Sequence, residues 1–292
     1  MAELQILSPM HKDLGGGFNV RRLLPALDRQ AVGPFLFFDH FGPITEHAGE
    51  RHDVRPHPHI GLATVTYLFE GAIVHRDSIG VVQRIEPGAI NLMMAGRGIV
   101  HSERAPADLV GVERRSHGLQ LWMALPSERE EDAPSFQHVA AAQLPRLDVD
   151  GVRVGVLVGS AFGQDSPVRT ASPTLYLDLE VLGAADRPWV VPPLAQERAL
   201  YSLAHPVELD GQRVEPCSMV VLPVGAEPCL RAPAGARLVM IGGAPLGRRH
   251  IVWNFVSSSR ERIVQAQDDW LARRFDPVPG ETEFIPLPSR TA

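Results

Sequence analysis

Two pairs of potential metal ligands constrain the fold of this chain more than any other feature of its sequence. His57 and His59 form the first pair, His101 and Glu103 form the second, and one residue separates the partners in each pair. Alternate residues of a β-strand point to the same face, so each pair would present both side chains on one side of a strand. Two such strands side by side in a barrel would direct four donors into one interior volume. The spacing therefore predicts a β-fold built around a mononuclear metal site.

This donor set narrows the choice of metal. Imidazole offers a neutral nitrogen near pH 7, and a carboxylate supplies negative charge that helps to hold a divalent ion. Because the set has no thiolate, a closed structural zinc site is disfavoured, although a zinc ion that only braces the barrel stays an alternative. A metal that prefers six positions would keep about two open for water, O2 or substrate. Fe(II), Ni, Cu, Co, Mn or Zn would suit these ligands, so the donor set alone does not choose among them. Fe(II) is the ion we expect.

The composition excludes several other classes of protein. The chain has 292 residues, enough for two domains, with a formal charge of −6 and 45% hydrophobic residues. A nucleic-acid-binding protein would need a basic stripe, which this sequence lacks. There is no apolar run of about 18 residues and no signal-like N-terminal segment, so we expect a soluble, cytoplasmic protein without membrane contact. The 26 glycines and 26 prolines are typical of many short strands joined by turns.

Short β-branched and aromatic runs predict strands in both halves of the chain. They lie at 63–69, 81–85, 89–94 and 119–124 in the first half, and at 152–158, 174–181, 199–203, 218–222 and 236–241 in the second. The charged, aperiodic stretch between Pro126 and Pro134 is the predicted start of a linker. We therefore expect an N-terminal metal-binding domain over residues 1–130 and a C-terminal domain without metal ligands over residues 131–292.

A weak internal repeat connects the two halves. Residues 84–88 (RIEPG) resemble residues 213–217 (RVEPC) at an offset of 129 (213 − 84). The same offset aligns three further pairs: Gly96 with Gly225, His101 with Leu230, and Glu103 with Ala232. The repeat predicts that the second half keeps the framework of the first and has lost its ligands.

One helix is predicted near the C-terminus. Ser258-Ser259-Arg260-Glu261 has the form of a capping box, and apolar residues recur at near-helical spacing until Asp276-Pro277 stops the run. These apolar residues are Ile263, Val264, Trp270, Leu271 and Phe275. We expect an amphipathic helix that packs against a sheet, followed by a proline-rich tail that is extended or mobile.

Several segments, taken together and in order, resemble the pirin family of the cupin superfamily. They are residues 56–59 (PHPH), 64–71 (TVTYLFEG), 94–103 (MAGRGIVHSE) and 117–122 (HGLQLW), with further support from 38–43 (FDHFGP) and 242–246 (GGAPL). The resemblance implies an all-β fold of two cupin-type β-barrel (jelly-roll) domains packed face to face, with a short C-terminal α-helix and a metal only in the first domain. It also implies that the metal ligands are His57, His59, His101 and Glu103, the same four that the spacing selects.

The chain departs from the family pattern at one notable position. Many pirins carry Glu where this chain has Ala63, so any role of that carboxylate toward substrate would be absent here. His117 lies close to the motif but matches no family ligand. A hydrogen bond within the barrel wall is expected for its imidazole.

The resemblance suggests a function, because bacterial pirins resemble quercetin 2,3-dioxygenases. The leading hypothesis is a metal-dependent dioxygenase of that type, which opens a flavonol or a similar enol-bearing ring with O2 and releases carbon monoxide. The partners would then be a flavonol-like small molecule and O2. Glu103 would be catalytic as well as a ligand, since it is the nearest base for the flavonol hydroxyl proton.

The alternative function belongs to another class. Some pirins look like redox-responsive regulatory proteins, in which the oxidation state of the metal alters a surface that binds a transcription factor or a metabolic enzyme. A protein partner would then replace the small-molecule substrate. Neither hypothesis implies a nucleic-acid or membrane partner.

Overall fold

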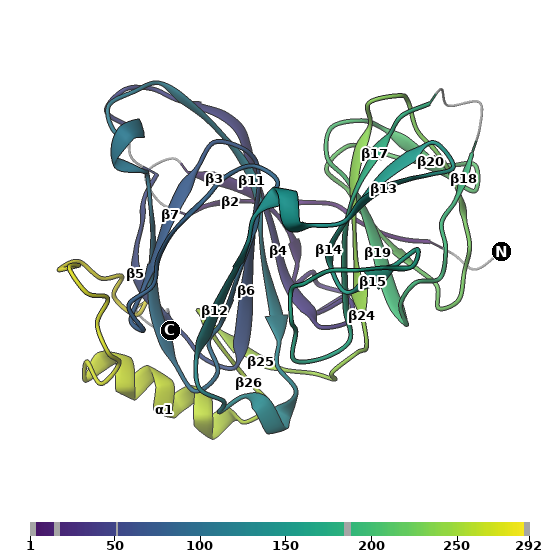
Figure 1. Cartoon of the computed structure of the whole chain (residues 1–292). Helices are drawn as coiled ribbons and strands as arrows, with labels where there is room; N and C mark the ends of the chain where they lie inside the picture. The colour runs from purple at the N-terminus through teal and green to yellow at the C-terminus, as the bar shows by residue number, and fades with distance from the viewer. Residues whose placement is uncertain (1–3, 15–17, 51, 184–187, 289–292) are drawn as a thin grey trace. The chain divides into compact units, whose positions relative to one another are not determined.

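The computed structural model describes residues 4–14, 18–50, 52–183 and 188–288 of the chain. These residues form mostly strands, with one α-helix near the C-terminus, as the sequence predicts (Figure 1). Within the described ranges, no helix is long and apolar enough to cross a membrane.

The chain divides into two compact units whose segments alternate along the sequence. One unit, termed the histidine unit because it holds the predicted ligands, comprises the described parts of 12–20, 40–141 and 247–292. The other, termed the apolar unit, comprises the described parts of 1–11, 21–39 and 142–246. The units therefore differ at both chain ends from the predicted division into 1–130 and 131–292. The reason is pairing: β1 (Gln5–Leu7) joins β22 (Met219–Leu222) of the second half, whereas the segment after 246 packs on the first.

The histidine unit is built on two antiparallel sheets. The seven strands of the larger sheet, in spatial order, are β12 (Ser135–Val139), β9 (Ile90–Met94), β6 (Leu62–Glu70), β11 (Arg114–Ala124), β4 (Phe35–Glu46), β3 (Asn19–Leu24) and β2 (Met10–Asp13). The last three of these strands also contain residues that belong to the apolar unit. The four strands of the smaller sheet are β5 (Val54–His59), β10 (Ile99–Arg104), β7 (Ile73–Asp77) and β8 (Val82–Ile85). Across the interior, the Trp122 ring of β11 meets the His59 ring of β5 edge-on, with centroids 5.2 Å apart. The two sheets therefore enclose the predicted ligands.

The apolar unit repeats this arrangement. Its larger sheet has the order β1, β22, β19 (Glu197–Ser202), β24 (Arg237–Gly243), β17 (Thr174–Val181), β14 (Val152–Val158) and β13 (Arg146–Val149). Its smaller sheet has the order β18 (Trp189–Val190), β23 (Cys229–Arg231), β20 (Val207–Leu209) and β21 (Gln212–Val214). A two-stranded ribbon, β15 (Ser160–Ala161) with β16 (Gln164–Asp165), completes the unit.

Strand order and backbone conformation support the predicted repeat. The order β18-β23-β20-β21 matches β5-β10-β7-β8, and β22-β19-β24-β17 matches β9-β6-β11-β4. The aligned glycines Gly96 and Gly225 both have positive φ, at +52° and +73°. Gly88 aligns with Cys217, which keeps a φ of +58° although it carries a side chain. The second half thus retains the turns of the first.

Apolar side chains occupy the ligand positions of the repeat. His101 pairs with His57 in the histidine unit, and the aligned Leu230 pairs with Trp189 in the apolar unit. The four residues at these positions are all buried in the core of the apolar unit; they are Trp189, Val191, Leu230 and Ala232. Hydrophobic packing therefore fills the space that holds imidazoles in the other unit.

The predicted helix forms, but it begins and ends differently from the sequence interpretation. Helix α1 (Arg260–Leu271) has Ser259 as its N-cap, whose side chain accepts a hydrogen bond from the Arg262 backbone N–H. The capping position is therefore one residue later than predicted, and the helix stops before Phe275. Leu271, predicted to be on the apolar face, is 66% exposed.

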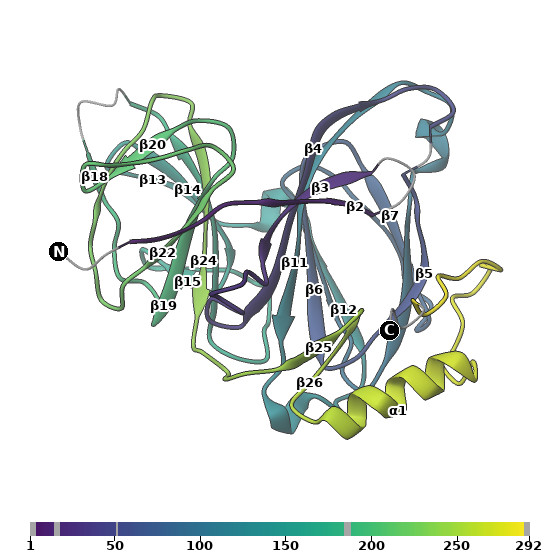
Figure 2. The same cartoon turned by 180° about the vertical axis from the view of Figure 1, so that it is seen from behind.

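The helix packs on a short hairpin in the histidine unit. The hairpin consists of β25 (His250–Val252) and β26 (Phe255–Ser257). Ile263 and Ala266 of α1 are buried in a cluster with Phe255 and Ile60, the residue after β5. Figure 2 shows the hairpin beside α1, and in both views the chain after α1 returns to β5 (Figures 1 and 2). The C-terminal segment thereby covers the edge of the strand that carries His57 and His59.

The charged stretch predicted to start a linker is instead part of the histidine unit. It contains a 3-10 turn, η2 (Ser127–Arg129), followed by Glu130, which is only 4% exposed. The Glu130 carboxylate accepts hydrogen bonds from the Ser257 hydroxyl at 2.8 Å and the Ser258 backbone N–H at 3.0 Å, and pairs with Arg249 at 2.9 Å. The linker prediction is wrong because this carboxylate is buried against the C-terminal hairpin.

Candidate metal centre

Neighbouring strands bring three of the four predicted ligands into one group. His101 of β10 lies directly opposite His57 of β5, and all three histidines are buried. One ring nitrogen from each of His57, His59 and His101 lies within 4.8 Å of the others. Glu103 does not belong to this group, although its position two residues after His101 places it on the same face of β10.

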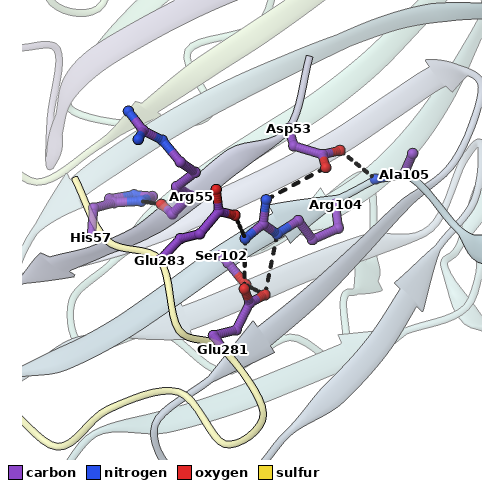
Figure 3. Close-up of polar contacts among 8 residues, drawn as sticks. All are labelled: Asp53, Arg55, His57, Ser102, Arg104, Ala105, Glu281 and Glu283. Carbon is purple, nitrogen blue, oxygen red and sulfur yellow. Dashed lines mark hydrogen bonds and ion pairs between the residues drawn. The ribbon is translucent and has the colours of Figure 1, made fainter. Parts of the chain in front are cut away.

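The local sequence of β5 explains how it presents the histidines. β5 is an edge strand of its sheet, where Pro56 and Pro58 are tolerated despite their missing N–H groups. The register with β10 shifts between the pairs His101–His57 and Glu103–Val54, so β5 carries one extra residue there. This β-bulge frees the Arg55 carbonyl, which lies 2.9 Å from Nδ1 of His57 (Figure 3).

Backbone carbonyls select the tautomers of two ligands. A carbonyl oxygen can only accept, so Nδ1 of His57 donates to Arg55, and Nδ1 of His59 donates to the Asn254 carbonyl at 3.1 Å. The Nε2 atom of each neutral ring then carries a lone pair. Asn254 lies in the turn of the β25–β26 hairpin, so the C-terminal segment contacts His59 directly.

Burial keeps these imidazoles neutral. Loss of water lowers the pKa of His57 to about 4, against an opposing effect of its hydrogen bond to Arg55. Desolvation also holds the pKa values of His59 and His101 well below 6.5, and the neighbouring imidazoles lower them further. At pH 7 the rings are therefore in the form that binds a metal.

The donor set fits a divalent ion. Nε2 of His59 lies 3.1 Å from Nε2 of His101, close to the separation of about 3 Å expected for two nitrogens that share one metal at about 2.1 Å. Nε2 of His59 has no proton, so it can accept a hydrogen bond from Nε2 of His101 or, in its place, bind a cation. The residues that would hold the ion are His57, His59 and His101, with Glu103 as the carboxylate.

Glu103 sits beside the histidines in a polar part of the interior. Its Oε1 lies 3.4 Å from the Thr66 hydroxyl, which is also 3.0 Å from the side-chain oxygen of Gln120. Desolvation raises the pKa of Glu103, while His75 and the Thr66 hydroxyl act in the opposite direction. A carboxylate with a raised pKa is a stronger base than one exposed to water.

The structure also places Ala63 and His117, the two further positions noted in the sequence. Ala63 alternates with Thr64 on β6, so it lies on the face opposite that of Thr66 and Glu103. A glutamate at this position would therefore not point toward the histidines. His117 forms the expected wall hydrogen bond, with its Nε2 2.8 Å from Nε2 of His40.

The C-terminal tail is held against the strands that carry the ligands. Arg104, at the end of β10, pairs with Glu281 at 2.6 Å, Glu283 at 2.8 Å and Asp53 at 3.5 Å (Figure 3). The Ser102 hydroxyl donates to the same Glu281 carboxylate at 2.8 Å, and the Ile285 backbone N–H donates to the carbonyl of Pro56. The tail, predicted to be extended or mobile, contains a turn at Val278–Glu281 and is anchored beside His57.

Sequence reasoning missed His75 and Asp77, which lie behind His101. They occupy β7 at the same i, i+2 spacing as the ligand pairs, and β7 pairs with β10. A third pair at strand spacing was therefore visible in the sequence. The sequence does not reveal that β7 pairs with β10, so it gave no reason to connect this pair with His101.

The fold and the site together define a two-domain cupin with a histidine triad able to hold a metal in one domain. The chain belongs to the pirin family: the Pirin family profile matches residues 17–123, and that of the pirin C-terminal cupin domain matches residues 176–276.

Individual relatives match nearly the whole chain. A pirin-like protein of Caulobacter vibrioides is 44% identical over 287 residues, which cover 97% of this chain and 98% of that protein. Human pirin is 33% identical over 272 residues, 90% of this chain and 89% of its own. The crystal structure of a quercetin 2,3-dioxygenase from Acinetobacter baumannii aligns with a TM-score of 0.90 and 33% identity, covering 98% of this chain and 95% of that one.

Proposed function

We propose that this protein is a metal-dependent dioxygenase of the quercetin 2,3-dioxygenase type, acting on a flavonol or a similar enol. The observation that carries the proposal is the group of three neutral, buried imidazoles, two with Nε2 freed by backbone carbonyls, in a fold shared with a quercetin 2,3-dioxygenase. A divalent ion held there, with Fe(II) as first choice, would bind the substrate hydroxyl and favour its ionised form.

The proposed roles of the chain's residues follow from their surroundings. Glu103 would complete the ligand set and, as the carboxylate at the site, take the hydroxyl proton. The Thr66 hydroxyl would contact its carboxyl group from the opposite sheet. Trp122 and Phe136 pack on His59 and His75, and their rings would exclude water from the site.

The test is a flavonol assay with defined metals. Protein reconstituted separately with Fe, Ni, Cu, Co or Mn is mixed with quercetin without oxygen and then exposed to air. We expect at least one metal form to remove the flavonol absorption band and release carbon monoxide. Glu103→Gln should lower that rate by about 10²- to 10⁴-fold through loss of the base, with metal content measured in parallel. An unchanged band with all five fully loaded forms would refute the proposal.

Elemental analysis of protein purified without added metal tests the regulatory alternative. A redox-responsive protein needs a metal that changes oxidation state, and Zn(II) does not. Zinc as the sole metal would therefore count against a redox switch, whereas iron without quercetin turnover would favour it.

A further inference from the structure

Two buried polar residues outside the ligand set lie directly behind His101. In the register of β7 with β10, Asp77 is opposite His101 and His75 is opposite Glu103, so all four share one face of the sheet. His75 is 4% exposed and Asp77 is completely buried. The His75 ring also stacks on Phe136 at a centroid distance of 4.5 Å. Their positions are therefore closely fixed.

The contacts form a chain that ends at the candidate ligand. Oδ2 of Asp77 lies 3.0 Å from Nε2 of His75, and Nδ1 of His75 lies 3.4 Å from Nδ1 of His101. An ionised carboxylate only accepts, so Nε2 of His75 donates to Asp77. When the His75 ring is neutral, its Nδ1 is therefore an acceptor. Nδ1 of His101 then donates to it. This leaves the Nε2 of His101 without a proton, like those of the other two histidines.

Asp77 is anchored independently of the histidines. Its Oδ1 accepts hydrogen bonds from the backbone N–H groups of Ile79 at 3.1 Å and Val81 at 3.0 Å, in the turn between β7 and β8. Among the described residues, no lysine or arginine forms an ion pair with this carboxylate. A buried carboxylate without a cation is costly. A divalent ion with three neutral imidazoles and the Glu103 carboxylate keeps one positive charge, which Asp77 would balance.

We propose that His75 and Asp77 are positioning residues for the metal: they hold His101 in the tautomer that binds and supply the balancing charge. This inference rests on the metal site proposed above. In the two proposed ligands on β5, Nδ1 donates to a backbone carbonyl, which likewise leaves Nε2 free. Side-chain substitutions would not remove these carbonyls. Only the hydrogen bond behind His101 comes from side chains, so mutagenesis can reverse it.

Asp77→Asn would reverse the direction of the hydrogen bond between residue 77 and His75, while the side chain keeps nearly the same size and shape. With its oxygen still accepting from Ile79 and Val81, the new amide would donate to Nε2 of His75. Nδ1 of His75 would then carry the proton and face the proton on Nδ1 of His101. We expect the dissociation constant for Co(II), measured on metal-free protein against a competing chelator, to rise by about 10- to 100-fold. The absorption bands of bound Co(II) should shift, while the melting temperature of the metal-free protein changes little.

Further variants separate the loss of these hydrogen bonds from a general disruption of the fold. Ser78→Ala removes the hydroxyl that accepts from the Val100 backbone N–H and leaves the chain of imidazoles intact, so Co(II) affinity should stay at the wild-type value. His75→Gln keeps a donor and an acceptor at the same place and should retain most of the affinity, whereas His75→Leu should lose it. If Asp77→Asn does not fold, this His75 pair decides the question.

The outcomes separate the positioning role of His75 and Asp77 from the existence of the metal site. The positioning role is overturned if Asp77→Asn binds Co(II) with the wild-type affinity and spectrum. It is also overturned if His75→Gln and His75→Leu bind Co(II) equally well. Either result would leave the proposed metal site intact. Failure of the wild-type protein to bind Co(II) would overturn both.

Discussion

The His101→Ala protein is expected to bind almost no metal, where the wild type binds about one ion per chain. His101 is the member of the group that β10 supplies, and its ring lies 4.4 Å from that of His57 and 5.0 Å from that of His59. Its removal leaves two imidazoles on a single edge strand. The measurement is elemental analysis after reconstitution with Fe(II) and removal of unbound metal, with circular dichroism to verify the fold.

A second histidine serves as the matched control. The side chain of His47 is 67% exposed and pairs with Glu113 on the surface. His47→Ala should therefore keep about one ion per chain. If His101→Ala also kept its metal, the ion would be bound elsewhere and the ligand assignment would be wrong.

Glu130→Ala is expected to cost about 3–5 kcal/mol in the free energy of unfolding, because it leaves Arg249 buried without its carboxylate. The same change removes the acceptor for Ser257 and Ser258, which follow the hairpin turn that holds His59. Metal affinity should fall together with stability. Chemical denaturation of the metal-free protein gives the first quantity and chelator competition gives the second.

The adjacent glutamate provides the comparison. Glu131 pairs with Arg262 at 2.8 Å, but its side chain is 59% exposed. Glu131→Ala should cost less than about 1 kcal/mol, as for other exposed ion pairs. Similar losses in the two variants would show that Glu130 does not anchor the C-terminal hairpin.

The strand framework and the histidine group were accessible from sequence because each depends on local spacing. The strand at Thr174–Val181 appears within its predicted bounds, and the i, i+2 rule places both histidines of β5 on the same face. The repeat was also readable, since Gly96 and Gly225 serve turns that need positive φ. Such signals lie within a few residues of one another.

The parts that escaped prediction depend on contacts between distant residues. The carbonyl of Asn254 reaches His59 across 195 positions of sequence, and a backbone carbonyl has no residue type to identify it. Glu130 stands in a charge run that is typical of a solvated surface, yet the fold buries it against Ser257. The alternation of segments between the two units likewise follows from strand pairing, for which local periodicity contains no signal.

We propose above that His57, His59, His101 and Glu103 hold one divalent ion in the histidine unit. An anomalous difference map from crystals of metal-loaded protein, collected at the absorption edge of that metal, tests it most directly. We expect a single peak within about 2.0–2.2 Å of Nε2 of the three histidines and of a Glu103 carboxylate oxygen. A strong peak at another place, or a peak at the histidines with Glu103 turned away from it, would contradict the claim.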